Sequence, residues 1–461
     1  MSEYKFNLIP KKVKIIKTKN RRIITKIPPD YTVKILNELK KYEPKSMSTE
    51  LPVLWNHAKG HQVFDSSGNI WIDFSSGIFV ANVGHGHPKI KKAILEITKK
   101  PLLHNYFFPS EIRAKLVKKL ISMTPKYLNN VFLLTTGTEA IECAIKIIRT
   151  YGKNNKQSKV GILSFDNSMH GKTLGALMVG GKKNMKTWIS HHDPDMFHLP
   201  FPHYSTCPFA KNEEHICDDL CFEKVIKELG RKINLTNISG IMIETYQGWG
   251  ALFFPKLYVQ ALDKWAKKNG CLLVFDEIQA GFGRTGKLFA YEHYNVKPDI
   301  VCCGKGLSSS LPLSAVLSKR KLLDLDSSLN STHGGNPICV AATLASLEII
   351  EEENLISESD RKGKIVEKKL KELQKNNKKI IKEIAGKGLV WAIHIMNPIT
   401  KELDSKTGDV ILEEAMKNGV LMVRTSSGTL KIGPPLSIPD HALIEGLEVL
   451  DKIITKINQD V

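Results

Sequence analysis

Short, continuous runs of apolar residues recur between residues 131 and 318 and alternate with helical or loop segments. The runs are VFLLT, VGILSF, GIMIE, CLLVF, DIVCC and SAVL. A strand of a parallel sheet that is covered by helices on both faces is apolar on both faces, so its sequence is continuous rather than alternating. The pattern therefore predicts an α/β body with a mostly parallel sheet covered by helices.

Other patterns surround this body. Residues 60–74, GHQVFDSSGNIWIDF, predict two short strands joined by a Ser-Ser-Gly-Asn turn. A glycine-punctuated loop, GIFVANVGHGHP, follows, and then a helix with Pro88 in its first turn. From about Thr343, the helical stretch ATLASLEIIEEENL leads to the strand-like GLVWAIHI and a last helix, which together predict an appended α+β module.

The length of 461 residues exceeds the usual size of one compact core, so we expect more than one unit. Residues 1–85 are predicted to form an N-terminal arm and a segment that joins the smaller domain. Residues 86–342 are predicted to form the large α/β domain, and residues 343–461 the smaller α+β domain.

The chain is basic, with 67 Lys and Arg against 47 acidic residues. The lysines are spread along the whole chain and are not interleaved with aromatic residues, so we expect no nucleic-acid partner. No apolar run approaches the roughly 20 residues that span a bilayer, so we expect no membrane span. The basic first 26 residues lack the apolar core of a secretory signal, which favours a cytoplasmic protein. A targeting peptide, a solvated arm and an arm that crosses to a partner subunit remain alternatives for this segment.

Cysteines fall into two groups. Four lie inside apolar stretches, where a reduced, packed thiol is expected: Cys143, Cys271, Cys302 and Cys303. Three share the polar loop CPFAKNEEHICDDLC: Cys207, Cys217 and Cys221. His203 and His215 lie nearby, so a metal site was a candidate. The spacing matches no standard zinc pattern and lacks a second closely spaced pair, so no metal is predicted.

Polar residues follow two of the apolar runs directly. In open α/β sheets, ligands bind outside the carboxyl ends of the strands. Asp276 follows CLLVF, with Gln279 shortly after it, and Lys305 follows DIVCC between two glycines. A lysine at such a place is either a nucleophile with a lowered pKa or a surface cation. The flanking glycines and the carboxylate of Asp276 favour the nucleophile.

Together these residues suit a pyridine cofactor. A buried carboxylate such as Asp276 keeps a pyridine nitrogen protonated, so that the ring accepts electrons from the substrate's α-carbon. Lys305 would then do the covalent work and move the proton. The turn TTGT before a helix places the amides of Gly137 and Thr138 where they could hold a phosphate. Ordinary N-capping explains the same turn equally well.

From about Glu50 to Asp451 the chain resembles the class III, ornithine- and 4-aminobutyrate-type aminotransferases of the fold-type I pyridoxal-phosphate enzymes. LLVFDEIQAGFGRTGKLFAYEHYNVKPDIVCCGKGL and STHGGNPICVAA carry the resemblance. It implies pyridoxal 5′-phosphate as cofactor. It also implies a large domain with a mostly parallel, seven-stranded type of sheet and a smaller α+β domain.

The resemblance assigns roles at the cofactor. Lys305 corresponds to the Schiff-base lysine and Asp276 to the partner of the pyridine nitrogen. Gln279 corresponds to a residue near the ring's phenolic oxygen. Gly137 and Thr138 correspond to the residues that hold the phosphate.

Further roles are implied around these residues. Thr332 corresponds to the threonine that reaches the phosphate bound by the other subunit, which implies a homodimer with shared active sites, with a tetramer as the larger alternative. His170 belongs to the family's aromatic-His-Gly motif. The ring-stacking position of that motif is Met169 here.

The substrate side departs from the family. Glu244 of IETYQGWGA is kept, but Trp249 replaces the glutamate that screens the carboxylate-binding arginine, and Lys431 stands where that arginine normally lies. Loss of the guanidinium fork weakens recognition of a carboxylate. Arg424 is a candidate replacement, with a surface position as the alternative. Ile78 and Trp249 would make this side apolar and bulky.

We therefore expect an aminotransferase that moves an amino group from an amino-acid or amine donor to a 2-oxo acid through a Lys305 Schiff base. An amino-acid racemase or epimerase of the same family is the alternative, because it needs only one substrate. A non-catalytic binding protein would not need Lys305, Asp276 and the phosphate residues together.

Overall fold

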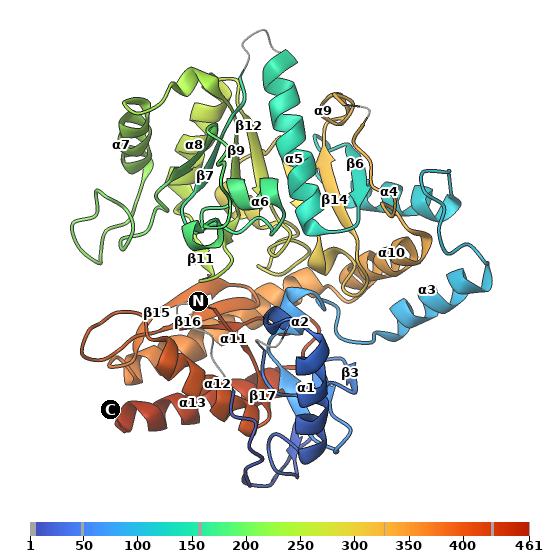
Figure 1. The fold of residues 1–461 in the computed structure, drawn as a ribbon, viewed down its shortest axis with the longest axis vertical. Helices are drawn as coiled ribbons and strands as arrows, with labels where there is room; N and C mark the ends of the chain where they lie inside the picture. The colour runs from blue at the N-terminus through green and yellow to red at the C-terminus, as the bar shows by residue number, and fades with distance from the viewer. Residues whose placement is uncertain (1–5, 48–49, 155–158, 327, 426–427, 461) are drawn as a thin grey trace.

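The computed structural model describes residues 6–47, 50–154, 159–326, 328–425 and 428–460. Figure 1 shows two layers of structure: a sheet with its helices above, and a second group of sheets and helices below. The lower group contains both the N-terminal segment, in blue, and the C-terminal segment, in orange and red.

The upper sheet has seven strands in the order β6-β14-β13-β12-β9-β7-β8. Their bounds are β6 (Asn130–Leu134), β7 (Gly161–Phe165), β8 (Met196–Leu199), β9 (Ile238–Glu244), β12 (Leu272–Asp276), β13 (Ile300–Cys303) and β14 (Ser314–Ser318). Only β14 runs antiparallel to its neighbours in this sheet. The six apolar runs are all strands, and the mostly parallel sheet is confirmed. Strand β8 escaped prediction because its sequence, MFHL, is short and contains a histidine.

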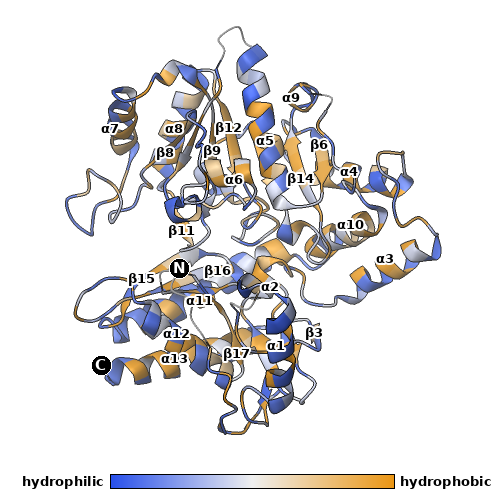
Figure 2. Cartoon of the chain, viewed as in Figure 1, coloured by the Kyte–Doolittle hydropathy of each residue, from blue (hydrophilic) through white to orange (hydrophobic). Residues whose placement is uncertain are grey.

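Helices cover both faces of this sheet. On β12, Leu272 and Val274 pack in one hydrophobic cluster with α5 (Gly137–Gly152), whereas Leu273 and Phe275 pack in another with α8 (Lys256–Lys268). Successive side chains of a strand point to opposite faces. The two clusters therefore explain why these strands are apolar at every position. In Figure 2 the helices around the sheet carry both hydrophilic and hydrophobic colours.

The remaining helices of the upper part are shorter or lie at its edges. They are α3 (Pro88–Lys99), α4 (Glu111–Met123), α6 (Leu174–Val179), α7 (Asp219–Gly230), α9 (Arg320–Leu323) and α10 (Pro337–Glu352). The predicted helix with Pro88 in its first turn is α3. Helix α10 begins at Pro337, so the predicted limit at residue 343 falls inside a helix that packs on α3 and α4. The other domain limits stay predictions.

The lower part joins the two ends of the chain. One sheet has the order β1-β2-β5-β4-β3, and β17 pairs with β5. Its strands are β1 (Ile16–Lys17), β2 (Arg22–Ile23), β3 (His57–Lys59), β4 (Gln62–Phe64), β5 (Ile70–Asp73) and β17 (Val420–Leu421). The predicted hairpin is β4 and β5, which pair antiparallel. Because β17 comes from the C-terminal part, the N-terminal segment is built into the same unit.

A second lower sheet has the order β15-β16-β19-β18. Its strands are β15 (Ile381–Lys387), β16 (Val390–Ile395), β18 (Val423–Arg424) and β19 (Thr429–Ile432). The lower helices are α1 (Asp30–Tyr42), α11 (Leu355–Asn376), α12 (Ser405–Lys417) and α13 (Asp440–Gln459). The predicted strand GLVWAIHI and the last helix are β16 and α13.

The segment predicted as a glycine-punctuated loop begins with a left-handed turn, labelled α2 in Figure 1 (Ser76–Phe79). The φ angles of Ser76, Gly77, Ile78 and Phe79 are 50°, 58°, 62° and 64°. Left-handed residues other than glycine each cost roughly 1–2 kcal/mol. The hydroxyl of Ser76 donates to the carbonyl of Gly433 at 2.6 Å, which ties the turn to the C-terminal part.

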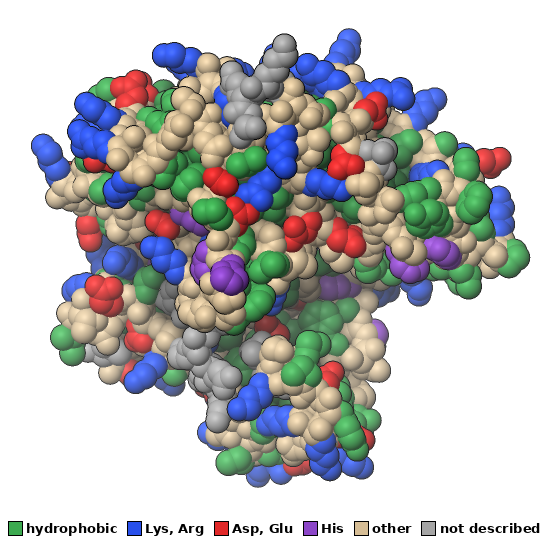
Figure 3. Space-filling view, turned by 45° about the horizontal axis from the view of Figure 1, so that its top comes forward, with side chains coloured by type: hydrophobic (Ala, Val, Ile, Leu, Met, Phe, Trp, Pro, Cys, Tyr) green, Lys and Arg blue, Asp and Glu red, His purple; other side chains and the backbone are tan. Residues whose placement is uncertain are grey.

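The distribution of charged residues on the surface and the hydropathy of the helices bear on possible partners. In the view of Figure 3, Lys and Arg are spread over the face and interspersed with acidic residues, and they do not gather in one patch. Among the described residues, no helix combines the length and the apolar character that crossing a bilayer requires.

Candidate active site

A cavity of about 550 Å³ lies where the carboxyl ends of β9, β12 and β13 meet the N-terminus of α5. Twelve of the residues predicted from the sequence line it: Ile78, Gly137, Thr138, Met169, His170, Glu244, Trp249, Asp276, Gln279, Lys305, Arg424 and Lys431. Thr332 does not line this cavity. It is exposed and lines a different one beside Glu139.

Lys305 begins the turn after β13. Its φ is 42°, a left-handed conformation that is strained for a residue with a side chain. A Cβ on the following Gly306 would lie 2.3 Å from the side-chain nitrogen of Asn82, which donates to the carbonyl of Phe282 at 3.0 Å, so a larger residue would displace Asn82. Burial lowers the pKa of Lys305, and Asp276 and Glu244 partly oppose this effect. The ε-amine is therefore more easily neutral, and hence nucleophilic, than that of a surface lysine.

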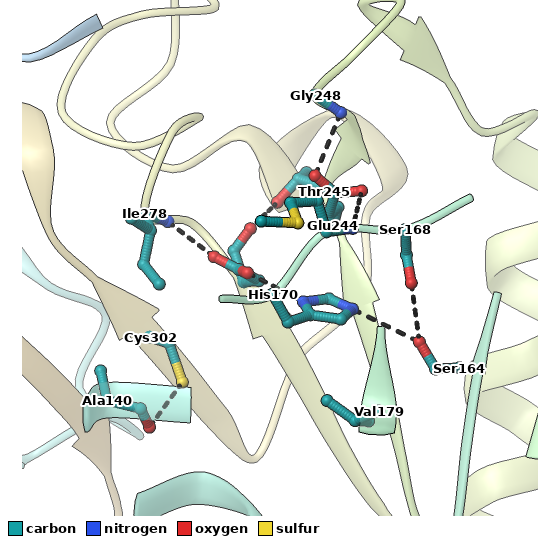
Figure 4. A network of polar contacts seen from close by, with 12 residues as sticks. Ala140, Ser164, Ser168, His170, Val179, Glu244, Thr245, Gly248, Ile278 and Cys302 are labelled. Atoms are coloured by element: carbon teal, nitrogen blue, oxygen red, sulfur yellow. Dashed lines mark hydrogen bonds and ion pairs between the residues drawn. The ribbon is translucent and has the colours of Figure 1, made fainter. Parts of the chain in front are cut away.

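Asp276 ends β12 and is buried. One of its oxygens contacts His170 Nδ1 at 2.9 Å, and the other accepts the amide of Ile278 at 3.0 Å. On the far side of the imidazole, Nε2 lies 3.3 Å from the hydroxyl of Ser164 (Figure 4). The side chain of His170 is completely buried. Asp276 is thus held in one orientation by an imidazole that is itself fixed.

Glu244 ends the neighbouring strand β9, in register with Asp276. Its carboxylate accepts the amide of Met169 at 3.1 Å and the amide of Gly248 at 3.1 Å (Figure 4). Burial, reinforced by the charge of Asp276, raises the pKa of Glu244 to about 7. This side chain therefore joins two loops of the cavity wall.

The N-terminus of α5 forms another wall. Thr136 caps the helix by accepting the amide of Glu139 at 3.2 Å, and the carboxylate of Glu139 accepts the amide of Thr136 at 3.0 Å. The next amides, of Gly137 and Thr138, have no partner within the helix. A Cβ on Gly171 would lie 2.6 Å from the hydroxyl of Thr138, so this loop packs tightly on the helix end. Such a helix terminus binds anions.

Sequence analysis missed two further cations in the cavity wall, Lys172 and Lys182. Burial lowers the pKa of Lys182, and Glu244 partly opposes this. The lysines of this chain are so numerous that two more near the His-Gly motif gave no signal. Their place on the short stretch after His170-Gly171 was the only available indication.

Lys431 lies at the opposite wall, on β19, and its exposed fraction is 1 %. Its ammonium donates to the carbonyl of Gly248 and, at 3.4 Å, to the amide oxygen of Gln279. It also lies 4.9 Å from the ring centroid of Phe79 and 5.6 Å from that of Tyr246. This lysine is held by a carbonyl, an amide and two aromatic faces.

The burial of Lys431 changes the pKa of its ammonium group. Burial lowers the pKa of Lys431 to about 7, Glu244 opposes the shift, and Arg284 and Lys305 add to it. The ammonium of Lys431 is therefore charged below about pH 7 and neutral above it.

Arg424 lies in the same wall and is not at the surface, with an exposed side-chain fraction of 11 %. Its Nε pairs with the carboxylate of Asp409, and its Nη1 donates to the carbonyl of Thr425 at 3.0 Å. Trp249 donates through its indole nitrogen to Gln247 at 2.8 Å. The guanidinium of Arg424 is thus already paired with the carboxylate of Asp409.

Known proteins resemble the chain along most of its length. The profile of the class-III aminotransferases matches residues 44–454. A probable 4-aminobutyrate aminotransferase of Bacillus subtilis (strain 168) is 34 % identical over 405 residues, which cover 85 % of this chain and 91 % of that protein. An isoleucine 2-epimerase of Lentilactobacillus buchneri is 31 % identical over 442 residues, 93 % and 96 % of the two chains. An amine transaminase from an uncultivated Pseudomonas species, solved in its pyridoxal-phosphate-bound form, has a TM-score of 0.81 at 24 % identity, and the match covers 90 % of this chain and 97 % of that one.

Proposed function

The chain belongs to the class-III aminotransferases, and on that premise we propose that pyridoxal 5′-phosphate binds in the cavity around Lys305 and Asp276. The fold is that of the fold-type I pyridoxal-phosphate transferases. The amino group passes from an amino-acid or amine donor to a 2-oxo acid. The observation that carries the proposal is the meeting, in one cavity, of a lysine with a lowered pKa, a fixed carboxylate and a helix N-terminus.

The residues present fit this cofactor. The amides of Gly137 and Thr138 suit its phosphate, and the packing of Gly171 on Thr138 leaves no side chain in the way. Asp276, fixed by His170, suits the pyridine nitrogen. Fold-type I relatives that bind this cofactor support the same placement.

Other cavity residues support the ring. We assign Gln279 to the side of the ring's phenolic oxygen. The side-chain oxygen of Gln279 accepts the hydroxyl of Tyr246 at 3.2 Å, which fixes the orientation of its amide. Met169 would pack against the ring face, since Glu244 holds its backbone in place. Glu244 is therefore a positioning residue.

Pyridoxal 5′-phosphate supplies a carbonyl that condenses with amines and a ring that accepts electrons from the substrate's α-carbon. Lys305 would hold the cofactor through its Nζ, and the same amine, once free, would take the proton from the substrate's α-carbon. Its lowered pKa makes the amine more readily neutral than a surface lysine, as proton transfer from carbon requires. The carboxylate of Asp276 would face the ring nitrogen and favour its protonated form.

The opposite wall would bind the substrate. We assign Lys431 to the substrate carboxylate, because its hydrogen bonds go to neutral oxygens of Gly248 and Gln279, whereas Arg424 is paired with the carboxylate of Asp409. Ile78 and Trp249 supply apolar surface. A single buried ammonium recognises a carboxylate without the geometry of a guanidinium fork.

We further propose a homodimer with shared active sites, with a tetramer as a larger assembly. Thr332 is exposed away from the cavity of its own chain, where it could reach a second subunit. Beside it, the side-chain Nδ2 of Asn336 donates to the carbonyl of Leu103 at 2.8 Å. The exposed fractions of Leu103 and Phe108 are 58 % and 74 %, so an apolar surface adjoins Thr332. We place the enzyme in the cytoplasm, since none of the eight cysteines, each in the described part of the chain, forms a disulfide.

An absorbance titration of the purified holoenzyme tests the proposal. Single L-amino acids and amines are added without a 2-oxo acid, and the products are analysed on a chiral column. We expect the band of the lysine-bound cofactor to convert to that of its amine form, with one keto acid released per site. Lys305→Ala should lack the first band, and Lys364→Ala, an exposed variant on α11, should behave as the wild type.

Two results would contradict the proposal. If the first band persists while the amino acid loses its optical purity, the enzyme is a racemase or epimerase, as its similarity to the isoleucine 2-epimerase would then explain. If Lys305→Ala retains the same band, the cofactor is not attached at Lys305.

A further inference from the structure

The segment between β8 and α7, residues 200–218, is long and contains neither helix nor strand. Loops of this length without secondary structure are uncommon in compact domains and usually need another source of order. This loop and the first turn of α7 bring four residues together: Cys207, His215, Cys217 and Cys221.

The four side chains form a compact cluster. One ligand atom from each, three Sγ atoms and one imidazole nitrogen, all lie within 4.8 Å of one another. Cys221 Sγ is 3.3 Å from His215 Nε2. Zinc–sulfur bonds of about 2.3 Å in a tetrahedron place the sulfur atoms about 3.8 Å apart, so only small shifts are needed to close such a site. We propose that this cluster binds one Zn²⁺ ion with a Cys₃His ligand set.

Local backbone contacts hold the ligands in place. Asp218 caps α7 by accepting the amide of Cys221 at 3.0 Å. The amide of Cys207 donates to the carbonyl of His203 at 2.7 Å. The cysteines are buried, with exposed fractions of 8 % for Cys207, 2 % for Cys217 and 5 % for Cys221, and His215 is half-buried. Burial keeps water and chelators away from the site.

A second observation at the cluster points to a bound cation. Tyr258, on α8, has an exposed fraction of 1 %, and its hydroxyl has no hydrogen-bond partner among the residues that the structure describes. Tyr258 packs in the same hydrophobic cluster as the three cysteines, and its ring lies 5.3 Å from that of Phe222, the residue after Cys221. A buried donor without a partner is costly. A zinc-bound thiolate is the acceptor that it lacks, in the way that outer groups orient metal ligands.

The donor set and its geometry select the metal. Three thiolates and one imidazole favour zinc over calcium or magnesium, which take oxygen ligands. Mutual distances within 4.8 Å suit one ion, whereas a two-iron cluster spreads its four ligands over two metal atoms. Four protein ligands complete a tetrahedron and leave no open position, so the site is structural rather than catalytic.

The spacing did not reveal this site because successive ligands lie eight, two and four residues apart, the first three in irregular loop and the fourth in the first turn of α7. A turn at Asn212, which accepts the amide of His215 at 3.2 Å, folds the segment back on itself. The folded chain, and not a repeated Cys-x-x-Cys pair, brings the ligands together.

The position of the loop links the metal to the active site. Thr206, next to Cys207, lines a cavity of about 560 Å³ together with Trp249 and Lys182. Trp249 and Lys182 also line the cavity around Lys305. Zinc would therefore fix a wall that adjoins the substrate side of the enzyme, without taking part in the reaction.

Metal analysis of the full-length holoenzyme tests the proposal. We expect one zinc per chain after purification and dialysis against a weak chelator. Cys217→Ser and His215→Ala should lose the metal, whereas Cys339→Ser, a half-buried cysteine outside the cluster, should keep it. Replacement by Co²⁺ should give the intense visible absorption of a tetrahedral thiolate site.

Further variants separate binding from folding. Tyr258→Phe keeps the ring that packs 5.3 Å from Phe222 and should retain zinc, but lose it to a chelator about 10–100-fold more readily. If Cys217→Ser does not fold, the cobalt spectrum of the wild type still shows whether the cluster binds a metal in a tetrahedral thiolate site. A wild type supplied with zinc that stays metal-free and shows no tetrahedral cobalt spectrum would overturn the proposal, as would equal zinc in the wild type and in His215→Ala.

Discussion

The two ends of the active-site cavity differ in how they are built. The end that we assign to the cofactor rests on one sheet: Asp276 and Glu244 end adjacent strands, and Lys305 follows the next. The end that we assign to the substrate is assembled from distant segments. Ile78 comes from a left-handed turn near the N-terminus and Lys431 from a strand near the C-terminus.

The fold therefore fixes the positions of the residues at the cofactor end more strongly than the identities of the residues at the substrate end. Residues at the carboxyl ends of parallel strands meet whenever the sheet forms, and the sheet is common to the family. Residues on different segments can change without disturbing the sheet. By its resemblance to the family, the chain keeps Lys305 and Asp276 at the cofactor end and departs there only in the ring-stacking Met169, whereas at the substrate end it departs at both Trp249 and Lys431.

The largest effect is expected for Lys305→Ala. Removal of the amine takes away both the covalent attachment and the proton transfer, so turnover should fall by at least about 10⁴-fold. Steady-state kcat and the cofactor's absorbance after gel filtration are the measurements. A loss of less than tenfold would show that the cofactor end is not where the reaction occurs.

Asp276→Asn should have the next largest effect. The variant keeps the shape of the side chain but removes the charge that holds a proton on the ring nitrogen, so kcat should fall by about 10²–10³-fold. Thermal unfolding shows whether the contact with His170 still holds the strand end in place. Ser164→Ala, on the far side of the same histidine, is the control and should cost about tenfold or less. Equal losses in the two variants would contradict a direct role for Asp276.

Lys431 provides a test of the substrate end through its pKa of about 7. The ammonium is charged below this pH and neutral above it. KM for a substrate that binds through its carboxylate should therefore rise about tenfold between pH 6 and pH 8, whereas KM for an amine without a carboxylate should not. Comparing the two substrates on one enzyme removes the contribution of Lys305, which acts on both.

Lys431→Arg is the matched variant. A guanidinium stays charged over this pH range and forms two parallel hydrogen bonds to a carboxylate, so KM should be lower and independent of pH. If the pH dependence persists in this variant, it belongs to Glu244, whose pKa is also about 7. If KM does not change, the substrate carboxylate binds elsewhere.

The residues at the cofactor end were easier to predict from the sequence than the structure at the substrate end. Asp276 and Lys305 line one cavity, as their position directly after apolar runs predicts, because that position depends only on local sequence. The left-handed turn at Ile78 and the cation at Lys182 were missed. Their positions depend on contacts between distant segments, such as that of Ser76 with Gly433, which no local pattern records.

The smallest effect is expected at Ile78, where strain and side-chain size can be separated. Ile78→Ala and Ile78→Gly both empty the apolar surface, but only glycine adopts a φ of 62° without strain. Relief of roughly 1–2 kcal/mol of left-handed strain is partly offset by the greater flexibility of unfolded glycine, about 0.5–1 kcal/mol. The glycine variant should therefore unfold at a slightly higher temperature than the alanine variant, while both show similar increases in kcat/KM for bulky donors. If the alanine variant is the more stable, the turn is not strained. If neither variant changes the preference for bulky donors, Ile78 does not border the substrate, and the substrate end has other walls.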